Sequence, residues 1–154
     1  VPRDVAAKAG PWDESLSLND DGEYFCRVVL ASAGVAFCAD PAARTLYRSG
    51  LMGSLSQRHD ERARRSQFRS IELLAGHMRA AEDSARTRRA VGLSYQRFVH
   101  DFFPAPAGLV REAEVRAAAL GVSRAAPAMG GKTAALARVI GWKNTWRLKH
   151  LLRR

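Results

Sequence analysis

Apolar residues recur at helical spacing in two segments near the start of the chain. Residues 3–9 place their apolar side chains on one side of a short helix, and the Gly-Pro pair that follows ends it because proline cannot continue the hydrogen-bond ladder. After a loop, the pattern predicts a second helix over residues 20–33. Asn19 or Asp20 is expected to cap this helix, since a short polar side chain accepts a hydrogen bond from its free amides.

The pattern changes between the second helix and residue 48. Residues 35–38 are short and apolar, Asp40-Pro41 is a turn signal, and residues 44–48 carry a threonine and a tyrosine. This stretch is the one strand-like region of the sequence. It predicts two short strands that pair as a small β hairpin.

From residue 60 onward the helical period returns and persists to the end of the chain. An Ala-, Pro- and Gly-rich stretch, residues 123–130, is predicted to be a linker. The predicted helices cover residues 60–82, 84–102, 107–120 and 131–153. The pattern therefore predicts a mainly α protein with a small β hairpin.

Charge divides the chain into two parts. The 154 residues carry a formal net charge of +10. Residues 1–57 contain 5 basic and 7 acidic residues, whereas the rest contains 20 basic and 8 acidic residues. The chain thus has an acidic first part and a basic, helical second part.

Cysteine usage and hydropathy bear on the cellular compartment. Cys26 and Cys38 have neither CxxC spacing nor enough partners for a disulfide framework, so reduced thiols are expected. No apolar run approaches the roughly 18 to 20 residues that span a bilayer, and the first residues do not resemble a signal peptide. We expect a cytoplasmic protein, peripheral to the inner face of the membrane if its basic tail binds there.

Acidic residues concentrate in the stretch GPWDESLSLNDDGEYFCR, residues 10–27. A carboxylate at a helix N-terminus stays ionised and is held by amide donors, which suits a general base that accepts a proton from a hydroxyl. Asp20 and Asp21 are the candidates. The alternative is structural: Asp20 caps the helix, and Asp21 and Glu23 only stabilise its positive end.

This stretch resembles the acceptor-side segment of inverting family 2 glycosyltransferases, which have the α/β glycosyltransferase-A fold. Their acidic pair is more commonly Glu-Asp, whereas this chain has two aspartates. By the resemblance, Asp21 takes the position of the catalytic base, which deprotonates the acceptor hydroxyl as it attacks a nucleotide-sugar. The matching residues are Gly10, Trp12, Asp13, Glu14, Asp20, Asp21, Gly22, Glu23 and Arg27.

The resemblance also implies substrate contacts and a cofactor. Trp12 either stacks on a sugar face or covers the local core, and Tyr24 and Phe25 are expected in the core. A divalent cation, Mg²⁺ or Mn²⁺, is expected in the full enzyme, with ligands mainly outside this chain. His59 is an alternative metal ligand, but a helix-start residue is the better explanation for it. The substrate-binding candidates are Trp12, Asp13, Glu14, Asp20, Arg48 and Ser49, with Ser54 and Ser56 as weaker ones.

The resemblance implies a division of the chain. Residues 1–57 are the expected acceptor-side part of a truncated catalytic domain of the glycosyltransferase-A fold, and residues 58–122 a helical extension. The linker 123–130 then leads to a basic amphipathic helix, residues 131–154. The donor-binding half is expected upstream in a longer protein, so this segment alone is expected to be inactive. The implied partners are a nucleotide-sugar donor and a saccharide or lipid-linked acceptor.

Other signals favour binding functions. Seven arginines of the basic part suit nucleic-acid phosphates, although no recognition motif accompanies them. Apolar residues occur alongside basic ones over 131–154, which suits either an anionic membrane surface or packing on the other helices. The stretch AAPAMGGKT lacks the first glycine and the preceding strand of a P-loop, so a nucleotide triphosphatase is rejected. The seven arginines are Arg62, Arg64, Arg65, Arg69, Arg86, Arg88 and Arg89.

Overall fold

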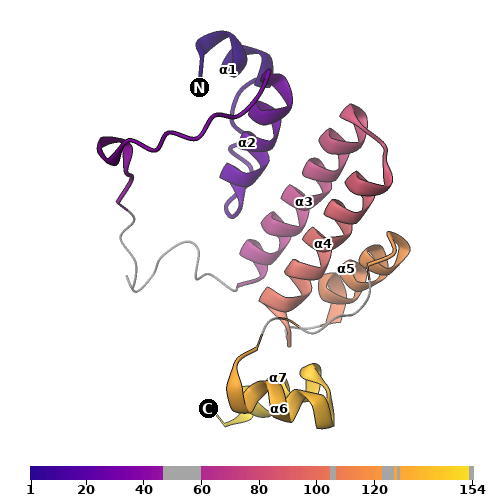
Figure 1. The fold of residues 1–154 in the computed structure, drawn as a ribbon. Coiled ribbons are helices and arrows are strands. Elements are labelled where there is room, and N and C mark those ends of the chain that lie inside the picture. Colours follow the sequence, from indigo (N-terminus) through magenta and orange to yellow (C-terminus); the bar gives the residue numbers. More distant parts are fainter. Residues whose placement is uncertain (47–59, 105–106, 123–126, 128, 153–154) are drawn as a thin grey trace. The chain divides into compact units, whose positions relative to one another are not determined.

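The computed structural model describes residues 1–46, 60–104, 107–122, 127 and 129–152. Over these residues the protein has seven α-helices, one short 3-10 helix and no β-strand (Figure 1). The chain forms two compact units, Val1–Asp83 and Ser84–Arg154, which are described separately.

The first unit is built around helix α2 (Asp20–Ala31), which packs against both α1 (Arg3–Ala9) and α3 (Glu61–Ala81). The predicted helix 3–9 is confirmed; Gly10 ends it with a φ of 78°, and its amide bonds back to the Ala7 carbonyl at 3.3 Å. Helix α2 ends two residues before the predicted end. The buried apolar residues of this unit are Ala9, Leu16, Val28, Ala63, Phe68 and Ile71.

Helix α3 begins where the sequence predicted. The Asp60 side chain accepts a hydrogen bond from the Ala63 amide at 2.8 Å, which caps the first turn. The helix ends at Ala81, one residue before the predicted end. Its long polar side faces solvent, while Ser66 and Ser70 are buried on the other side together with Phe68.

The predicted β hairpin is wrong over the described residues. Residues 35–40 and 44–46 run without a ladder of backbone hydrogen bonds, and Asp40 caps the short 3-10 helix η1 (Pro41–Ala43) by accepting from the Ala42 amide at 2.8 Å. Phe37 is 93% exposed, so an apolar strand-like pattern here has no sheet to pack on. The turn signal is confirmed by η1, but the described residues on either side of it form no strand.

The predicted fold class is therefore corrected. Every regular element among the described residues is helical, so this part of the chain is not an α/β glycosyltransferase-A fold with a β hairpin. A strand satisfies its backbone groups only through a neighbouring strand. Residues 35–38 have the composition of a strand, but no second strand lies beside them in the described part of the chain.

The second unit has α4 (Ala85–Phe102) packed along α5 (Ala107–Ala119). Ser84 caps α4 by accepting from the Thr87 amide at 3.2 Å. After α5, Gly121 takes a φ of 74°, and the Val122 amide bonds to the Ala117 carbonyl at 3.0 Å, which is a Schellman ending. The buried apolar residues of this unit are Val91, Tyr95, Phe98, Val99, Phe102, Val110, Ala113, Ala117 and Val122.

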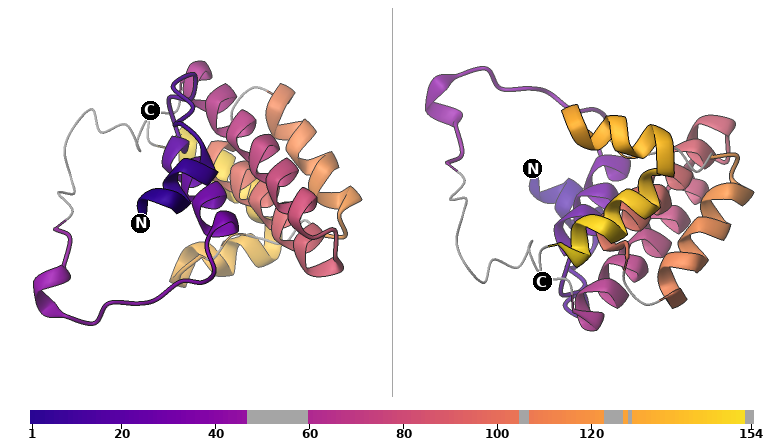
Figure 2. Two further views of the ribbon diagram at one scale, coloured as in Figure 1. Left: turned by 90° about the horizontal axis from the view of Figure 1, so that it is seen from above. Right: turned by 90° about the horizontal axis from the view of Figure 1, so that it is seen from below.

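The predicted single helix over 131–153 is wrong. It is two helices, α6 (Gly131–Ile140) and α7 (Trp142–Leu151), separated by Gly141 with a φ of 79° (Figure 2). A left-handed glycine ends α6 and redirects the chain. The helical spacing of apolar residues continues on both sides of Gly141, so the sequence pattern does not show this break.

Helix α7 is attached to the second unit by aromatic and charged contacts. The Trp142 ring lies edge-on to the rings of His100 and Phe103, with 5.2 Å between centroids in both cases. Lys143 forms an ion pair with Glu114 of α5. Across the described residues, no helix has both the length and the apolar character needed to cross a membrane.

Candidate functional site

The loop between α1 and α2 is fixed to α3 by one serine hydroxyl. Ser66 Oγ accepts hydrogen bonds from the backbone amides of Ser17 and Leu18, at 2.7 and 2.9 Å, and donates to the Leu18 carbonyl at 3.1 Å. Ser66 is 8% exposed. A loop without regular structure thus has its backbone groups satisfied by a helix side chain.

The residue before α2 is used differently from the prediction. Asn19 occupies the N-cap position in the left-handed region, with a φ of 59°, and its side chain does not cap the helix. Its amide nitrogen instead donates to Ser70 Oγ at 2.7 Å, and Ser70 Oγ donates to the Gln67 carbonyl at 2.9 Å. Asn19 therefore ties the start of α2 to α3.

A buried ion pair begins in the first turn of α2, whose acids Asp20, Asp21 and Glu23 are called the acidic turn below. Arg27 donates to Glu23 from Nε at 2.8 Å and from Nη2 at 2.9 Å, and His77 Nε2 of α3 lies 3.0 Å from Glu23 Oε1. The Glu23 side chain is 3% exposed. The hydrogen bonds from Arg27 lower the pKa of the Glu23 carboxyl, more than its burial raises it.

Arg27 also holds the turn that follows α1. Its two Nη atoms donate to the carbonyls of Ala9 and Pro11, the second at 2.9 Å. The hydrogen bond to Glu23 raises the pKa of Arg27, which is charged in any case. All three guanidinium nitrogens are therefore occupied, so Arg27 acts as a structural clamp between the turn and α2.

An aromatic cluster lies on the outer side of the acidic turn. Trp12 stacks on Tyr24 with 4.5 Å between ring centroids, and Phe25 meets both rings edge-on at 6.3 and 5.4 Å. Phe25 is 47% exposed and Trp12 39%. The expectation that Phe25 is a core residue is wrong, whereas Tyr24 is half-buried.

The acids of the loop and of α2 have different partners. The Asp13 carboxylate accepts from both the hydroxyl and the amide of Ser15, at 2.6 and 3.0 Å, which lowers the pKa of Asp13. Asp20 accepts from the Trp12 indole at 3.1 Å. Asp21 is exposed, and its carboxylate accepts from the adjacent Gly22 amide at 2.7 Å. Glu14 is exposed on the loop.

Asp21 differs from Glu23 because no cationic side chain among the described residues holds it. Across the residues that the structure describes, no arginine, lysine or histidine forms an ion pair with Asp21. Its position in the first turn of α2 places it beside the free amides of the helix start. The carboxylate is thus exposed and accessible to a hydroxyl.

Several predicted site residues lie outside the described residues. These are Arg48, Ser49, Ser54, Ser56 and His59. Within the described part, no three His, Cys, Asp or Glu side chains come together as a metal site. The described residues therefore do not supply a donor set for the expected divalent cation, and that cation stays a prediction.

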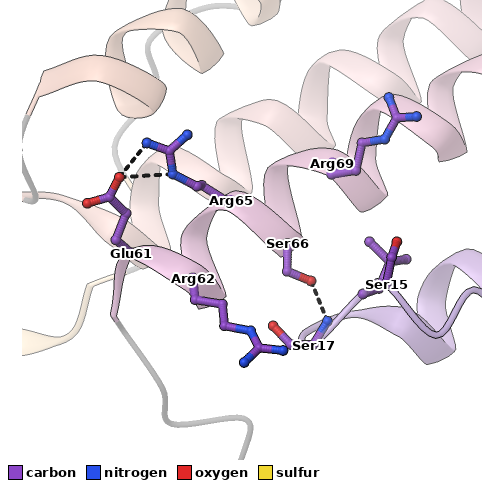
Figure 3. A pocket seen from close by; sticks show the side chains of 8 residues that line it. Ser15, Ser17, Glu61, Arg62, Arg65, Ser66 and Arg69 are labelled. Carbon is purple, nitrogen blue, oxygen red and sulfur yellow. Dashed lines mark hydrogen bonds and ion pairs between the residues drawn. The ribbon is translucent and has the colours of Figure 1, made fainter.

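A pocket lies between the loop and α3 (Figure 3). Its volume is about 430 Å³, and its walls are the loop residues 15–17 and one side of the first turns of α3. The eight lining residues are Ser15, Leu16, Ser17, Glu61, Arg62, Arg65, Ser66 and Arg69. Arg65 is engaged by Glu61, with a hydrogen bond of 2.9 Å from Nε.

Sequence reasoning missed the partners that α3 contributes to this region. Ser66, Ser70 and His77 meet residues of the loop and α2 across 48 or more positions of sequence. Their spacing of four and seven residues places them on one side of a helix, which was the available signal. The spacing alone does not show which segment of the chain these three side chains contact.

Comparisons of the chain with protein-family models, with curated proteins and with solved structures found no match.

Proposed function

We propose that this chain is the acceptor-side part of an inverting glycosyltransferase of family 2, with Asp21 as the general base. Asp21 accepts the proton of an acceptor hydroxyl, and the oxygen forms a bond to the anomeric carbon of a nucleotide-sugar. The bond from that carbon to the phosphate oxygen breaks, and the nucleoside diphosphate leaves with the electron pair. Attack from the side opposite the leaving group inverts the configuration.

The observation that carries this proposal is the contrast among the acids. Asp13 is used in a turn, Asp20 is bonded to Trp12, and Glu23 is buried against Arg27. Asp21 alone combines exposure with a fixed position in the first turn of α2 among these four. A general base needs access to its substrate and a defined geometry, and Asp21 has both.

The aromatic cluster supports a saccharide as the acceptor. The bond from the Trp12 indole to Asp20 connects the cluster to the residue next to Asp21. An exposed ring offers a flat apolar face to the C–H groups of a sugar. Asp20 and Trp12 then position the acceptor, and Asp13 and Glu14 extend the polar side of the loop.

The remaining participants follow from the resemblance. The donor is a nucleotide-sugar whose diphosphate is bound with a divalent cation by other parts of the full enzyme, and Arg48 and Ser49 are proposed as substrate contacts. The acceptor is a saccharide or a lipid-linked saccharide. We place the reaction in the cytoplasm, where nucleotide-sugars are made available to a protein with reduced thiols.

The test is the substitution Asp21→Asn in the full-length protein. It removes the proton acceptor and keeps the size and hydrogen bonding of the side chain. We expect release of nucleoside diphosphate from the active nucleotide-sugar to fall by about a hundredfold to ten-thousandfold, with the far-ultraviolet circular dichroism spectrum unchanged. Normal turnover by this variant would show that Asp21 is not the base.

Asp4→Asn is the matched control. Asp4 is also an exposed aspartate in the first turn of a helix, here α1, so the two variants lose the same charge from the same kind of position. We expect Asp4→Asn to keep its activity. Equal losses in both variants would point to a general effect of charge and not to a base at Asp21.

A second candidate is binding of α6 and α7 to an anionic membrane surface. Val139, Leu151 and Leu152 are 82%, 70% and 78% exposed, and lysines and arginines flank them. Trp142 contributes less, because it packs on His100 and Phe103. Co-sedimentation of the chain with vesicles rich in phosphatidylglycerol, lost in Val139→Ser/Leu151→Ser, tests this role; no sedimentation of the unaltered chain would exclude it.

A further inference from the structure

The pocket between residues 15–17 and α3 is lined on one side by three arginines. Arg62, Arg65 and Arg69 follow each other along α3 at spacings of three and four residues, and all three line the pocket. Figure 3 shows Arg62 extending toward Ser17, across the pocket from the helix. Three arginines from two turns of one helix thus line a single cavity.

The opposite wall of the pocket is held in place. The amides of Ser17 and Leu18 both donate to Ser66, which lies on α3 between the arginines. Each of these bonds is no longer than 2.9 Å, and Ser66 is buried. The distance between the loop and the arginines is therefore set by the fold, and a ligand does not have to order the loop when it binds.

The charge balance of the pocket is positive. Its lining contains three arginines and one carboxylate, Glu61, which is paired with Arg65. Arg69 lies 3.7 Å from Glu72, and both side chains remain partly exposed. In the described part of the chain, no carboxylate forms an ion pair with Arg62.

We propose that this pocket binds the phosphate or diphosphate group of a small molecule, with Arg62 and Arg69 as the principal ligands. The planar fork of an arginine donates two parallel hydrogen bonds to an oxyanion. Arg65 adds positive charge while Glu61 holds it to one side, and the Ser17 hydroxyl lies on the facing wall. The inference does not depend on the proposed sugar transfer, which uses Asp21.

The size of the site favours a small ligand over a nucleic acid. A cavity of about 430 Å³ admits a diphosphate with part of the group that carries it, and a pocket of this size is typical of small-molecule sites. A nucleic acid would be expected to follow an extended basic surface and to engage many arginines nearly equally. Three arginines around one cavity make a local site.

Titration calorimetry on the chain of residues 1–154 tests the proposal, with inorganic phosphate and inorganic pyrophosphate as probes at constant ionic strength. We expect saturable binding with one site, and tighter binding of pyrophosphate because it carries more charge. The double variant Arg62→Gln/Arg69→Gln should weaken pyrophosphate binding by at least about tenfold. Both side chains are exposed, so the substitutions leave the fold in place.

The control removes the same charge from the same unit at a distance from the pocket lining. Arg3→Gln/Arg44→Gln alters two other exposed arginines, and we expect it to bind pyrophosphate within about twofold of the unaltered chain. Equal weakening in both double variants would overturn the proposal, because it would reflect net charge and not a site. Absence of saturable binding by the unaltered chain would overturn it as well.

Two further arms identify the source of the phosphate. A nucleoside diphosphate and vesicles of phosphatidylglycerol are each titrated against the unaltered chain and the Arg62→Gln/Arg69→Gln variant. An effect of the variant on the nucleotide alone assigns a soluble ligand, and an effect on vesicles alone assigns a lipid headgroup. A short single-stranded oligonucleotide is the last probe. If it binds tightly and equally to both proteins, and pyrophosphate does not bind, the ligand is held by a diffuse basic surface and the pocket proposal is overturned.

Discussion

Arg27 holds the carboxylate of Glu23 with two nitrogens, Nε at 2.8 Å and Nη2 at 2.9 Å, while its other contacts reach the carbonyls of Ala9 and Pro11. The pair therefore joins α2 to the turn after α1. Removal of either partner leaves buried groups without compensation.

Arg27→Ala should destabilise the first unit by about 3 kcal/mol, because it leaves a buried carboxylate and two carbonyls without their donor. The measurement is urea-induced unfolding followed by the fluorescence of Trp12, in a background where Trp142 and Trp146 are phenylalanine. Arg65→Ala is the matched control: Arg65 also follows a glutamate, Glu61, by four residues, but this pair is 70% and 64% exposed. Its loss should cost much less than the loss of Arg27, because solvent screens an exposed pair, and equal costs would contradict a buried clamp.

Acid should weaken the first unit through Glu23. The pKa of this carboxyl is lowered from its ordinary value of 4.5, chiefly by Arg27. A lowered pKa gives stability that is complete above the ordinary value and is lost as pH falls through the folded one. The free energy of unfolding should therefore fall more steeply below about pH 5 in the unaltered protein than in Glu23→Gln; parallel pH profiles would be evidence against this role.

Gly92→Ala should destabilise the second unit. A Cβ at Gly92 would overlap Val122 Cγ2 and lie 3.2 Å from Leu120 Cβ, where the chain returns over α4. Overpacking of this kind costs about 1–3 kcal/mol. Gly76→Ala is the control, because a Cβ there meets no atom within 4 Å and alanine favours the helix by about 0.5–1 kcal/mol; thermal unfolding should shift in opposite directions.

Val122→Ala should partly rescue Gly92→Ala. It removes the methyl group that the new Cβ would meet, so the double variant is expected to be more stable than the sum of the two single effects predicts. If the two stability effects simply add, the overlap with Val122 is not the cause of the destabilisation by Gly92→Ala.

The two thiols should react at different rates. Cys38 is exposed, whereas Cys26 on α2 is half-buried and burial raises its pKa. The thiolate is the reactive form. At pH 7 a maleimide should therefore label Cys26 at about one tenth of the rate of Cys38 or more slowly still. Mass spectrometry of Cys26→Ser and Cys38→Ser reports each rate alone, and similar rates would contradict the placement of Cys26.

The sequence predicted most helix positions, because caps and apolar spacing are local properties. Asp60 and Ser84 both cap helices that begin where the pattern changes. The hairpin failed because residues 35–38 have apolar character but no partner strand in the described residues. The sequence does not reveal the break at Gly141, because glycines such as Gly76 and Gly92 lie inside helices, whereas Gly141 takes a positive φ.

The candidate site was only partly predictable for a related reason. The acids of residues 10–27 are visible in the sequence, and their carboxylates look alike there. Contacts sort them: Trp12 bonds to Asp20, and Arg27 and His77 bury Glu23. One of these contacts comes from His77 of α3, more than 50 positions from Glu23, and all of them depend on rotamers that no local pattern contains.

Ser66 has a further consequence for how the molecule moves. The amide protons of Ser17 and Leu18 belong to a loop, yet both point at a buried oxygen of α3. Exchange of such protons with solvent deuterium requires the acceptor to separate from them. Ser17 and Leu18 should therefore retain hydrogen as long as the surrounding helices stay closed, and the loop that carries the acidic turn moves as part of the helical unit.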